Sequence, residues 1–151
     1  MRSPVLTIAN HHDADAICQV LQSAYQMAWT LEKVHSYFSA DYTIIILKHD
    51  MALVGVAIIH WLPDGAELID LAIHADYQKQ HLGMQLLNRV IAQVREKSCQ
   101  TLFLEVRQSN TPAIGLYQKA GFKQIGLRKS YYPAGMGRED AITMKLELLN
   151  K

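Results

Sequence analysis

Short apolar runs alternate with longer amphipathic segments along the 151 residues of the chain. In the segments 12–27 and 82–95, apolar side chains recur every three to four residues, which is the spacing of one helix face. Two shorter helices are predicted at 31–38, after a capping Thr30, and between Pro112 and Gly121. Apolar runs typical of strands occupy 5–10, 42–48, 53–62, 67–73, 101–106, 122–132 and 141–149.

This order of elements, β-α-α-β-β-β-α-β-α-β-β, combines hairpins with at least one strand–helix–strand crossover. It therefore favours an α+β fold over a doubly wound parallel sheet. The polar, glycine-rich segment 133–140 is predicted to be a long hairpin loop between the last two strands. The chain carries no linker, repeat or low-complexity tract, so we expect residues 1–151 to form one domain.

The formal charge of +1 gives no electrostatic reason to expect a nucleic acid or a membrane surface as partner. No apolar run approaches the roughly 20 residues of a membrane span, and the first 15 residues lack the apolar core of a signal peptide. We therefore expect a cytoplasmic protein. Cys18 and Cys99 are isolated in the sequence and are expected to be reduced structural thiols.

The segment "QKQHLG" (78–83) lies between a predicted strand end and a predicted helix start. Free backbone N–H groups and the positive end of the helix dipole coincide there, so the segment is a candidate phosphate-binding turn. Taken alone, it also fits a plain loop. A metal site formed by His74, Asp76 and His81 would need three or four converging ligands, which the sequence does not support, so no metal is expected.

The pattern Q-x-x-x-x-G after a strand resembles the pyrophosphate loop of the GNAT (GCN5-related N-acetyltransferase) family, which binds acetyl-CoA. Downstream, "LFLEVRQSNTPAIGLYQKAGF" and "YYPAGMGREDAITM" resemble the RimI-type members, which modify the α-amino group of a ribosomal protein. The close resemblance runs from Glu67 to Leu146; residues 1–66 match only in element order and in an aromatic "AWT". It implies a mostly antiparallel twisted sheet of about seven strands, about four flanking helices, and a splayed parallel strand pair at the acetyl-CoA site.

The resemblance also assigns residues to the acetyl-CoA site. They come from the strand end, the loop, the helix start and the segment before the next helix: Leu71, Ala72, Ile73, Gln78, Lys79, Gln80, His81, Leu82, Gly83, Met84 and Asn110. His81 stands where the family usually has glycine, and this difference is expected to affect the local backbone geometry and the affinity for acetyl-CoA. If it falls within the first residues of the helix, we expect a helical φ and a backbone N–H directed at the pyrophosphate.

By the same resemblance, Glu105 is the general base and Tyr117 the general acid of a direct acetyl transfer to an amine. Each has a plainer reading. Glu105 can be a surface strand residue paired with Arg107 or a lysine, Tyr117 can be a core aromatic, and Asn110 can be only a helix cap.

Four residues are expected on the acceptor side: Trp29, Tyr131, Tyr132 and Glu139. Each also has an alternative. Trp29 can pack in the core, the two tyrosines can point to opposite faces of a strand, and Glu139 and Asp140 can lie in a solvated loop. Three functions remain open: a peptide N-terminal acetyltransferase acting on a ribosomal protein, an acetyltransferase for a small amine such as a polyamine or antibiotic, and a non-catalytic acetyl-CoA-binding module. The oligomeric state is not indicated by the sequence.

Overall fold

The structure is a computed structural model that describes residues 3–25, 29–134 and 137–148. The described strands are β1 Val5–Ile8, β2 Tyr42–His49, β3 Ala52–Trp61, β4 Gly65–Ile73, β5 Thr101–Arg107, β6 Lys123–Ala134 and β7 Gly137–Glu147. The described helices are α1 Ala14–Ala24, α2 Leu31–His35, α3 Leu82–Glu96 and α4 Thr111–Ala120, with short 3-10 turns η1 His11–Asp13 and η2 Ala75–Tyr77. The predicted element order is confirmed.

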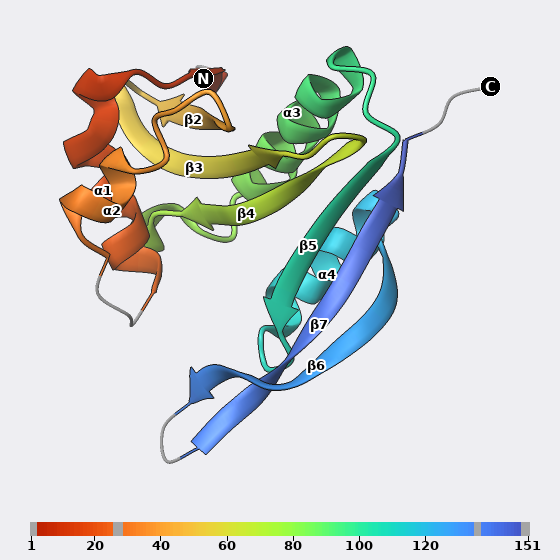
Figure 1. Ribbon diagram of the computed structural model, residues 1–151. Helices are drawn as coiled ribbons and strands as arrows, with labels where there is room; N and C mark the ends of the chain where they lie inside the picture. Colours follow the sequence, from red (N-terminus) through yellow and green to blue (C-terminus); the bar gives the residue numbers. More distant parts are fainter. Residues whose placement is uncertain (1–2, 26–28, 135–136, 149–151) are drawn as a thin grey trace.

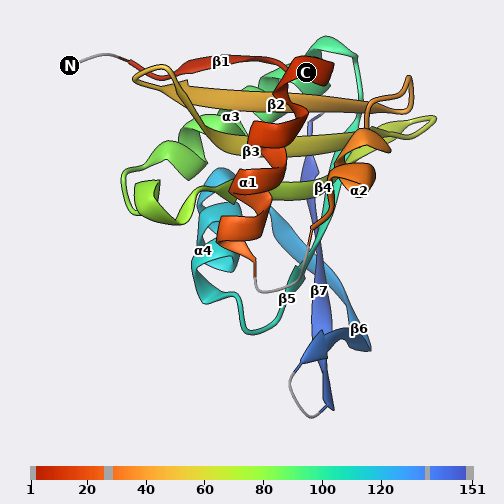
Figure 2. The same cartoon turned by 90° about the vertical axis from the view of Figure 1, so that its left-hand side faces the viewer.

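The seven strands form one sheet in the order β1-β2-β3-β4-β5-β7-β6. Only the β4–β5 pair among them is parallel. Helices α1 and α2 cover one face of the sheet, and α3 and α4 cover the other (Figures 1 and 2). The α+β architecture with a mostly antiparallel sheet is therefore confirmed.

Each face of the sheet has its own hydrophobic core. The predicted apolar stripe of α3 is buried in one of them: Leu82, Leu86, Leu87, Val90, Ile91 and Val94. The other core joins α1 and α2 to β2 and β3 through residues such as Ile17, Leu21 and Val34. Among the described residues, no helix combines the length and the apolarity needed to cross a membrane.

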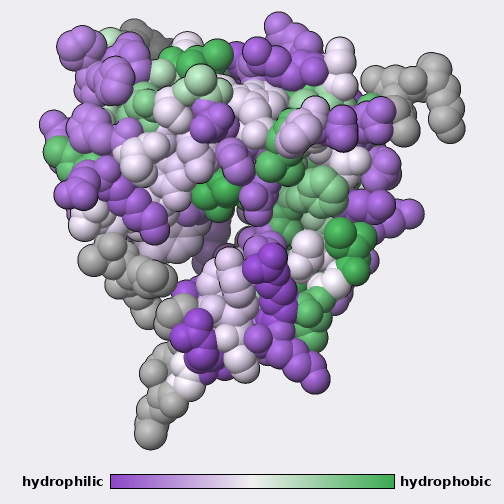
Figure 3. All heavy atoms as spheres, viewed as in Figure 1, coloured by the Kyte–Doolittle hydropathy of each residue, from purple (hydrophilic) through white to green (hydrophobic). Residues whose placement is uncertain are grey.

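The sheet opens between β4 and β5. Their pairing runs from Gly65 and Thr101 to Leu68 and Leu104, and beyond it the strands diverge (Figure 1). A bulge in β4 accompanies this divergence, because Ile59 pairs with Leu68 while Ile58 pairs with Asp70. Bulges bend a strand and redirect its side chains. The surface is hollowed between the β1–β4 half and the β5–β7 half (Figure 3).

The largest departures from the predicted bounds lie in the second helix and in the last hairpin. The helix predicted at 31–38 is the single turn α2, which Thr30 caps by accepting a hydrogen bond from the Lys33 amide (3.1 Å). The long hairpin loop predicted at 133–140 is wrong, since β6 and β7 remain paired as far as Ala134 and Gly137. Residues 135–136 of that segment lie outside the described residues.

Candidate active site at the opening of the sheet

The loop between β4 and α3 is held by a hydrogen bond back to the strand it leaves. Nε2 of Gln78 donates to the Ile73 carbonyl (3.0 Å), which closes the turn after β4. Lys79 and His81 then both adopt φ of 64°, so the chain passes twice through the left-handed region before α3 begins. Turns of this kind present backbone N–H groups on one concave side.

The helical φ expected for His81 is wrong. His81 is the N-cap of α3, with φ 64° and ψ 12°, and its side chain makes no capping hydrogen bond. The left-handed region favours glycine, because a Cβ crowds the following carbonyl there. The structure thus gives a physical reason for glycine at this position, and the histidine occupies it with its side chain exposed.

The first turn of α3 is open to an anion. The Gln85 amide donates to the His81 carbonyl (3.4 Å), and in the described part of the chain the preceding amides of Leu82, Gly83 and Met84 donate to no group outside the helix. A Cβ on Gly83 would only reach ordinary contact with Leu116 (3.6 Å), and this glycine has no positive φ. Packing within the protein therefore does not require glycine at position 83. The lack of a side chain there would instead let a ligand approach the backbone closely.

The remaining predicted cofactor residues border the opening. Leu71, Ala72 and Ile73 lie on β4 beyond its last pairing with β5. Asn110 is the N-cap of α4, where its Oδ1 accepts a hydrogen bond from the Ala113 amide (3.3 Å). The capping reading of Asn110 is therefore confirmed, while contact with a cofactor stays a prediction.

Glu105 lies on β5 and points away from the α3/α4 core. Leu102, Leu104 and Val106 alternate with it and are buried in that core. The Glu105 side chain is 15% exposed and forms an ion pair with Nε of Arg128 (2.9 Å), and not with Arg107 or a lysine as in the alternative interpretation.

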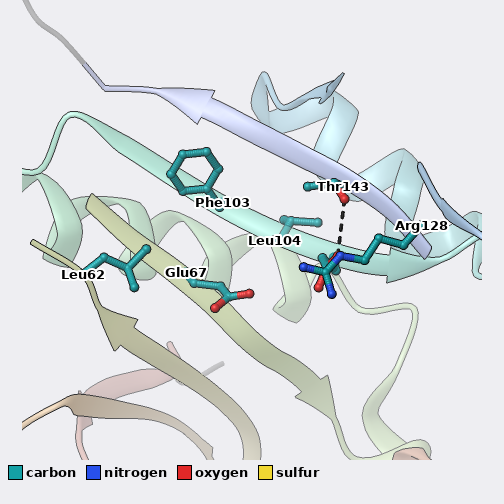
Figure 4. A pocket seen from close by; sticks show the side chains of 7 residues that line it. Leu62, Glu67, Phe103, Leu104, Arg128 and Thr143 are labelled. Carbon is teal, nitrogen blue, oxygen red and sulfur yellow. Dashed lines mark hydrogen bonds and ion pairs between the residues drawn. The ribbon is translucent and has the colours of Figure 1, made fainter. Parts of the chain in front are cut away.

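Oγ1 of Thr143 donates a further, longer hydrogen bond to the Glu105 carboxylate (3.4 Å). Glu105 lines a hollow of about 240 Å³ into which Glu67 from β4 and Arg128 from β6 also point (Figure 4). The carboxylate therefore borders an open space beside β5.

Tyr117 approaches the opening from α4 and is 7% exposed. Its ring packs edge-on against Phe122, with centroids 5.6 Å apart. Burial raises the pKa of the Tyr117 phenol well above its usual value, and the charge of Asp70 and the neighbouring Tyr132 raise it further. The phenol is therefore protonated at neutral pH and can donate a proton.

The predicted acceptor-side tyrosines lie together on β6, with ring centroids 5.0 Å apart. The guanidinium of Arg107 stacks on Tyr132 (4.5 Å) and that of Arg128 on Tyr131 (4.9 Å). Burial, followed by the charge of Glu105, raises the pKa of Tyr132 to about 12. Tyr132 therefore lies within electrostatic reach of the candidate base.

Glu139 and Trp29 have partners within the chain. The Glu139 carboxylate accepts hydrogen bonds from the Ser109 amide and hydroxyl and pairs with Arg107, all at 3.0 Å. The Ser109 hydroxyl bond contributes most to lowering the pKa of Glu139. Trp29 packs at the edge of the α1/α2 core, with the Lys33 ammonium 4.7 Å from its ring. Acceptor binding by either residue stays a prediction.

The sequence did not predict a further pair of residues at this opening, Asp70 and Tyr25. The Tyr25 hydroxyl at the end of α1 donates to Oδ1 of Asp70 and lies 3.5 Å from the Leu71 carbonyl. Burial raises the pKa of Asp70 to about 6, although the hydrogen bond from Tyr25 opposes this. In the sequence, Asp70 stands out as a lone carboxylate inside the apolar run "LIDLAI", and this pattern could have indicated it as a candidate functional residue.

In the part of the chain that the structure describes, no three His, Cys, Asp or Glu residues come together as a metal site. Of the residues considered for such a site, His74 accepts a hydrogen bond at its Nδ1 from the Asp76 amide (3.1 Å).

The chain resembles known proteins over most of its length. The Acetyltransferase (GNAT) family profile matches residues 14–122. A ribosomal protein bS18 alanine N-acetyltransferase from Escherichia coli (strain K12) is 36% identical over 136 residues, covering 90% of this chain and 92% of that protein.

Two solved structures share the fold. The crystal structure of the ribosomal-protein-S18-alanine N-acetyltransferase from Escherichia coli matches with a TM-score of 0.91 at 34% identity, covering 96% of this chain and 94% of that one. A GNAT family acetyltransferase from Elizabethkingia anophelis with acetyl-CoA bound matches with a TM-score of 0.81 at 21% identity, covering 98% of this chain and 100% of that one. The second match is a likeness of fold alone.

Proposed function

The chain belongs to the GNAT acetyltransferase family, and on that premise we propose that it acetylates the N-terminal α-amino group of an alanine-initiated protein, ribosomal protein bS18. The observation that carries the proposal is the 36% identity to an enzyme of that name along 90% of the chain. We further propose that residues 1–151 act as a single domain in the cytoplasm, where ribosomal proteins are made.

Acetyl-CoA supplies the activated acetyl group in this proposal. Its pyrophosphate fits the turn Gln78–Gln80 with His81 and the amides of Leu82, Gly83 and Met84, because these N–H groups lie at the positive end of α3. Its pantetheine arm fits the edge of β4 at Leu71, Ala72 and Ile73, where β5 has turned away. Asn110 at the start of α4 borders the same opening.

Proton transfers are assigned to Glu105 and Tyr117. A free α-amino group has a pKa of about 7.7–8.0, so a carboxylate is a sufficient base to remove its proton near neutral pH. Glu105 is paired with Arg128 and borders an open hollow, a position from which its carboxylate can accept that proton. Tyr117 keeps its proton at neutral pH and can deliver it to the departing thiolate.

The acceptor peptide is assigned to the side of the opening formed by β6 and the α1/α2 edge. Tyr131 and Tyr132 form an aromatic surface there, next to the candidate base. We include Trp29 and Glu139 in this assignment as residues that shape its edges, because both are already engaged by neighbours within the chain.

The test is incubation of the protein with acetyl-CoA and an alanine-initiated peptide, followed by mass spectrometry and measurement of free thiol. The same peptide with its N-terminus already acetylated is the control. Acetylation of the free peptide alone is expected. Thiol release only with small amines such as polyamines would indicate a small-molecule acetyltransferase, and acetyl-CoA binding without turnover would indicate a non-catalytic module.

A further inference from the structure

We propose that Asp70 is the anionic residue that binds the positively charged amino group of the acceptor, with Tyr25 holding its carboxylate in place. This inference rests on the proposed acetyl transfer to an α-amino group, and it assigns a binding role to a carboxylate that the transfer itself does not use.

Asp70 lies where an acceptor must enter. It follows the last β4–β5 pair at Leu68 by two residues, and the bulge at this point redirects the strand. Its cross-strand partner Ile58 packs in the α1/α2 core, so the Asp70 side chain is on that face of the sheet. Glu105 also points to that face, since its strand neighbours are buried in the opposite core. The two carboxylates therefore face the same side across the opening.

Among the described residues, the groups around Asp70 give its charge no ion-pair partner. Four phenols are close enough for its charge to raise their pKa values: Tyr25 from α1, Tyr37 after α2, Tyr117 from α4 and Tyr132 from β6. The Lys33 ammonium of α2 acts on Asp70 only through its charge, and it stacks on Trp29. A carboxylate surrounded by aromatic rings suits an ammonium ion.

A purely structural role does not explain the charge. The hydrogen bond from Tyr25 would tie the end of α1 to β4 equally well with an asparagine oxygen as acceptor. Desolvating a carboxylate that has no ion-pair partner costs stability, whereas a neutral amide does not carry that penalty. Asp70 carries a charge despite this cost in stability, and it lies close to the candidate acid Tyr117. This combination is typical of a functional residue.

The experiment is steady-state kinetics of the full chain carrying Asp70→Asn, with acetyl-CoA and an alanine-initiated peptide. We expect the peptide KM to rise about 10- to 100-fold, the range for losing a hydrogen bond to a charged group, while the KM for acetyl-CoA changes less than about twofold. Asp50→Asn removes the same charge from the distant β2–β3 turn and should leave both constants unchanged.

Two further measurements separate binding from structure. The N-acetylated peptide carries no positive charge at its N-terminus, so its inhibition constant should be the same for wild type and Asp70→Asn. The melting temperature of Asp70→Asn at pH 7.5 should equal or exceed that of wild type, because a half-buried charge without an ion-pair partner is gone. Tyr25→Phe keeps the carboxylate and should raise the peptide KM less than Asp70→Asn does.

The outcomes are distinct. An unchanged peptide KM in Asp70→Asn would overturn the inference and leave the acetyl transfer standing. A fall in kcat with an unchanged peptide KM would also overturn it, because it would assign Asp70 to proton transfer. Wild-type protein that fails to acetylate the peptide would refute the proposed function itself.

Discussion

Replacing His81 by glycine should stabilise the protein, because the backbone there is left-handed. His81 has φ 64° and ψ 12°, a conformation that costs a residue with a Cβ roughly 1–2 kcal/mol and costs glycine nothing. Glycine also makes the unfolded chain more flexible, and this reduces the gain in the free energy of unfolding by about 0.4–1 kcal/mol. Since histidine is among the residues that tolerate this region better, we expect a net gain of about 0.5–1 kcal/mol. For a chain of this size that is roughly 1–4 °C in Tm.

Gln80→Gly is the matched control, because residue 80 is the exposed neighbour and is not among the described residues with positive φ. It should lower the free energy of unfolding by about 0.4–1 kcal/mol, since only the unfolded-state effect remains. Thermal melts and urea titrations of both variants measure the two effects. Shifts of the same sign in both variants would show that the left-handed backbone at His81 carries no strain.

Acetyl-CoA affinity of the same His81→Gly variant tests how residue 81 contributes to the cofactor site. The proposed contact is the backbone N–H, which glycine keeps, so we expect affinity within about threefold of wild type between pH 5.5 and 8. Much tighter binding by the glycine variant at every pH would show that the imidazole obstructs the pyrophosphate site. Weaker binding confined to the acidic end would show that the charged imidazole attracts the anion.

Three further predictions concern the groups at the opening. Glu105→Gln should lower kcat by about 10²–10⁴-fold with little change in acetyl-CoA affinity, and Arg128→Gln, which removes the same ion pair but keeps the carboxylate, should lose far less activity. Tyr117→Phe should also lower kcat, and full activity would show that water protonates the thiolate. Asp70 has its pKa raised from 3.8 to about 6 on folding, so the folded wild type binds the proton more tightly and loses stability as pH rises between about 4 and 6. Asp70→Asn should therefore be about 1–3 kcal/mol more stable at pH 7.5 and equally stable below pH 4, as measured by urea unfolding across pH.

The features that the sequence predicted well are set by neighbours along the chain. The apolar stripe of α3 follows from helical spacing, and every residue of it is buried. The limits of α4 follow from Asn110 before it and Gly121 after it, where φ is 107°. The hairpins follow from apolar runs separated by short turns, such as Asp50 and Met51, which both have positive φ.

The features that the sequence did not predict depend on residues distant in the chain. Glu105 on β5 pairs with Arg128 on β6, although β7 lies between these two strands in the sheet. The spacing of residues along β5 cannot reveal this arrangement. Tyr25 meets Asp70 across 45 residues. The backbone of His81 is decided by how the loop must turn between the end of β4 and the start of α3, and the residue type at that position gave no indication of it.

Three carboxylates near the opening have different environments, and in the proposed mechanism each therefore has a different role. Glu139 is held by Ser109 and Arg107 and fixes the segment that precedes α4. Glu105 is paired with Arg128, whose side chain is 59% exposed, so water can replace the guanidinium as the partner of the carboxylate. Little free energy is therefore needed to release this carboxylate as a base. Asp70 is half-buried without an ion-pair partner and carries a desolvation penalty that a bound ammonium would relieve. An incoming amine is thus expected to meet Asp70 as a cation and to lose its proton to Glu105.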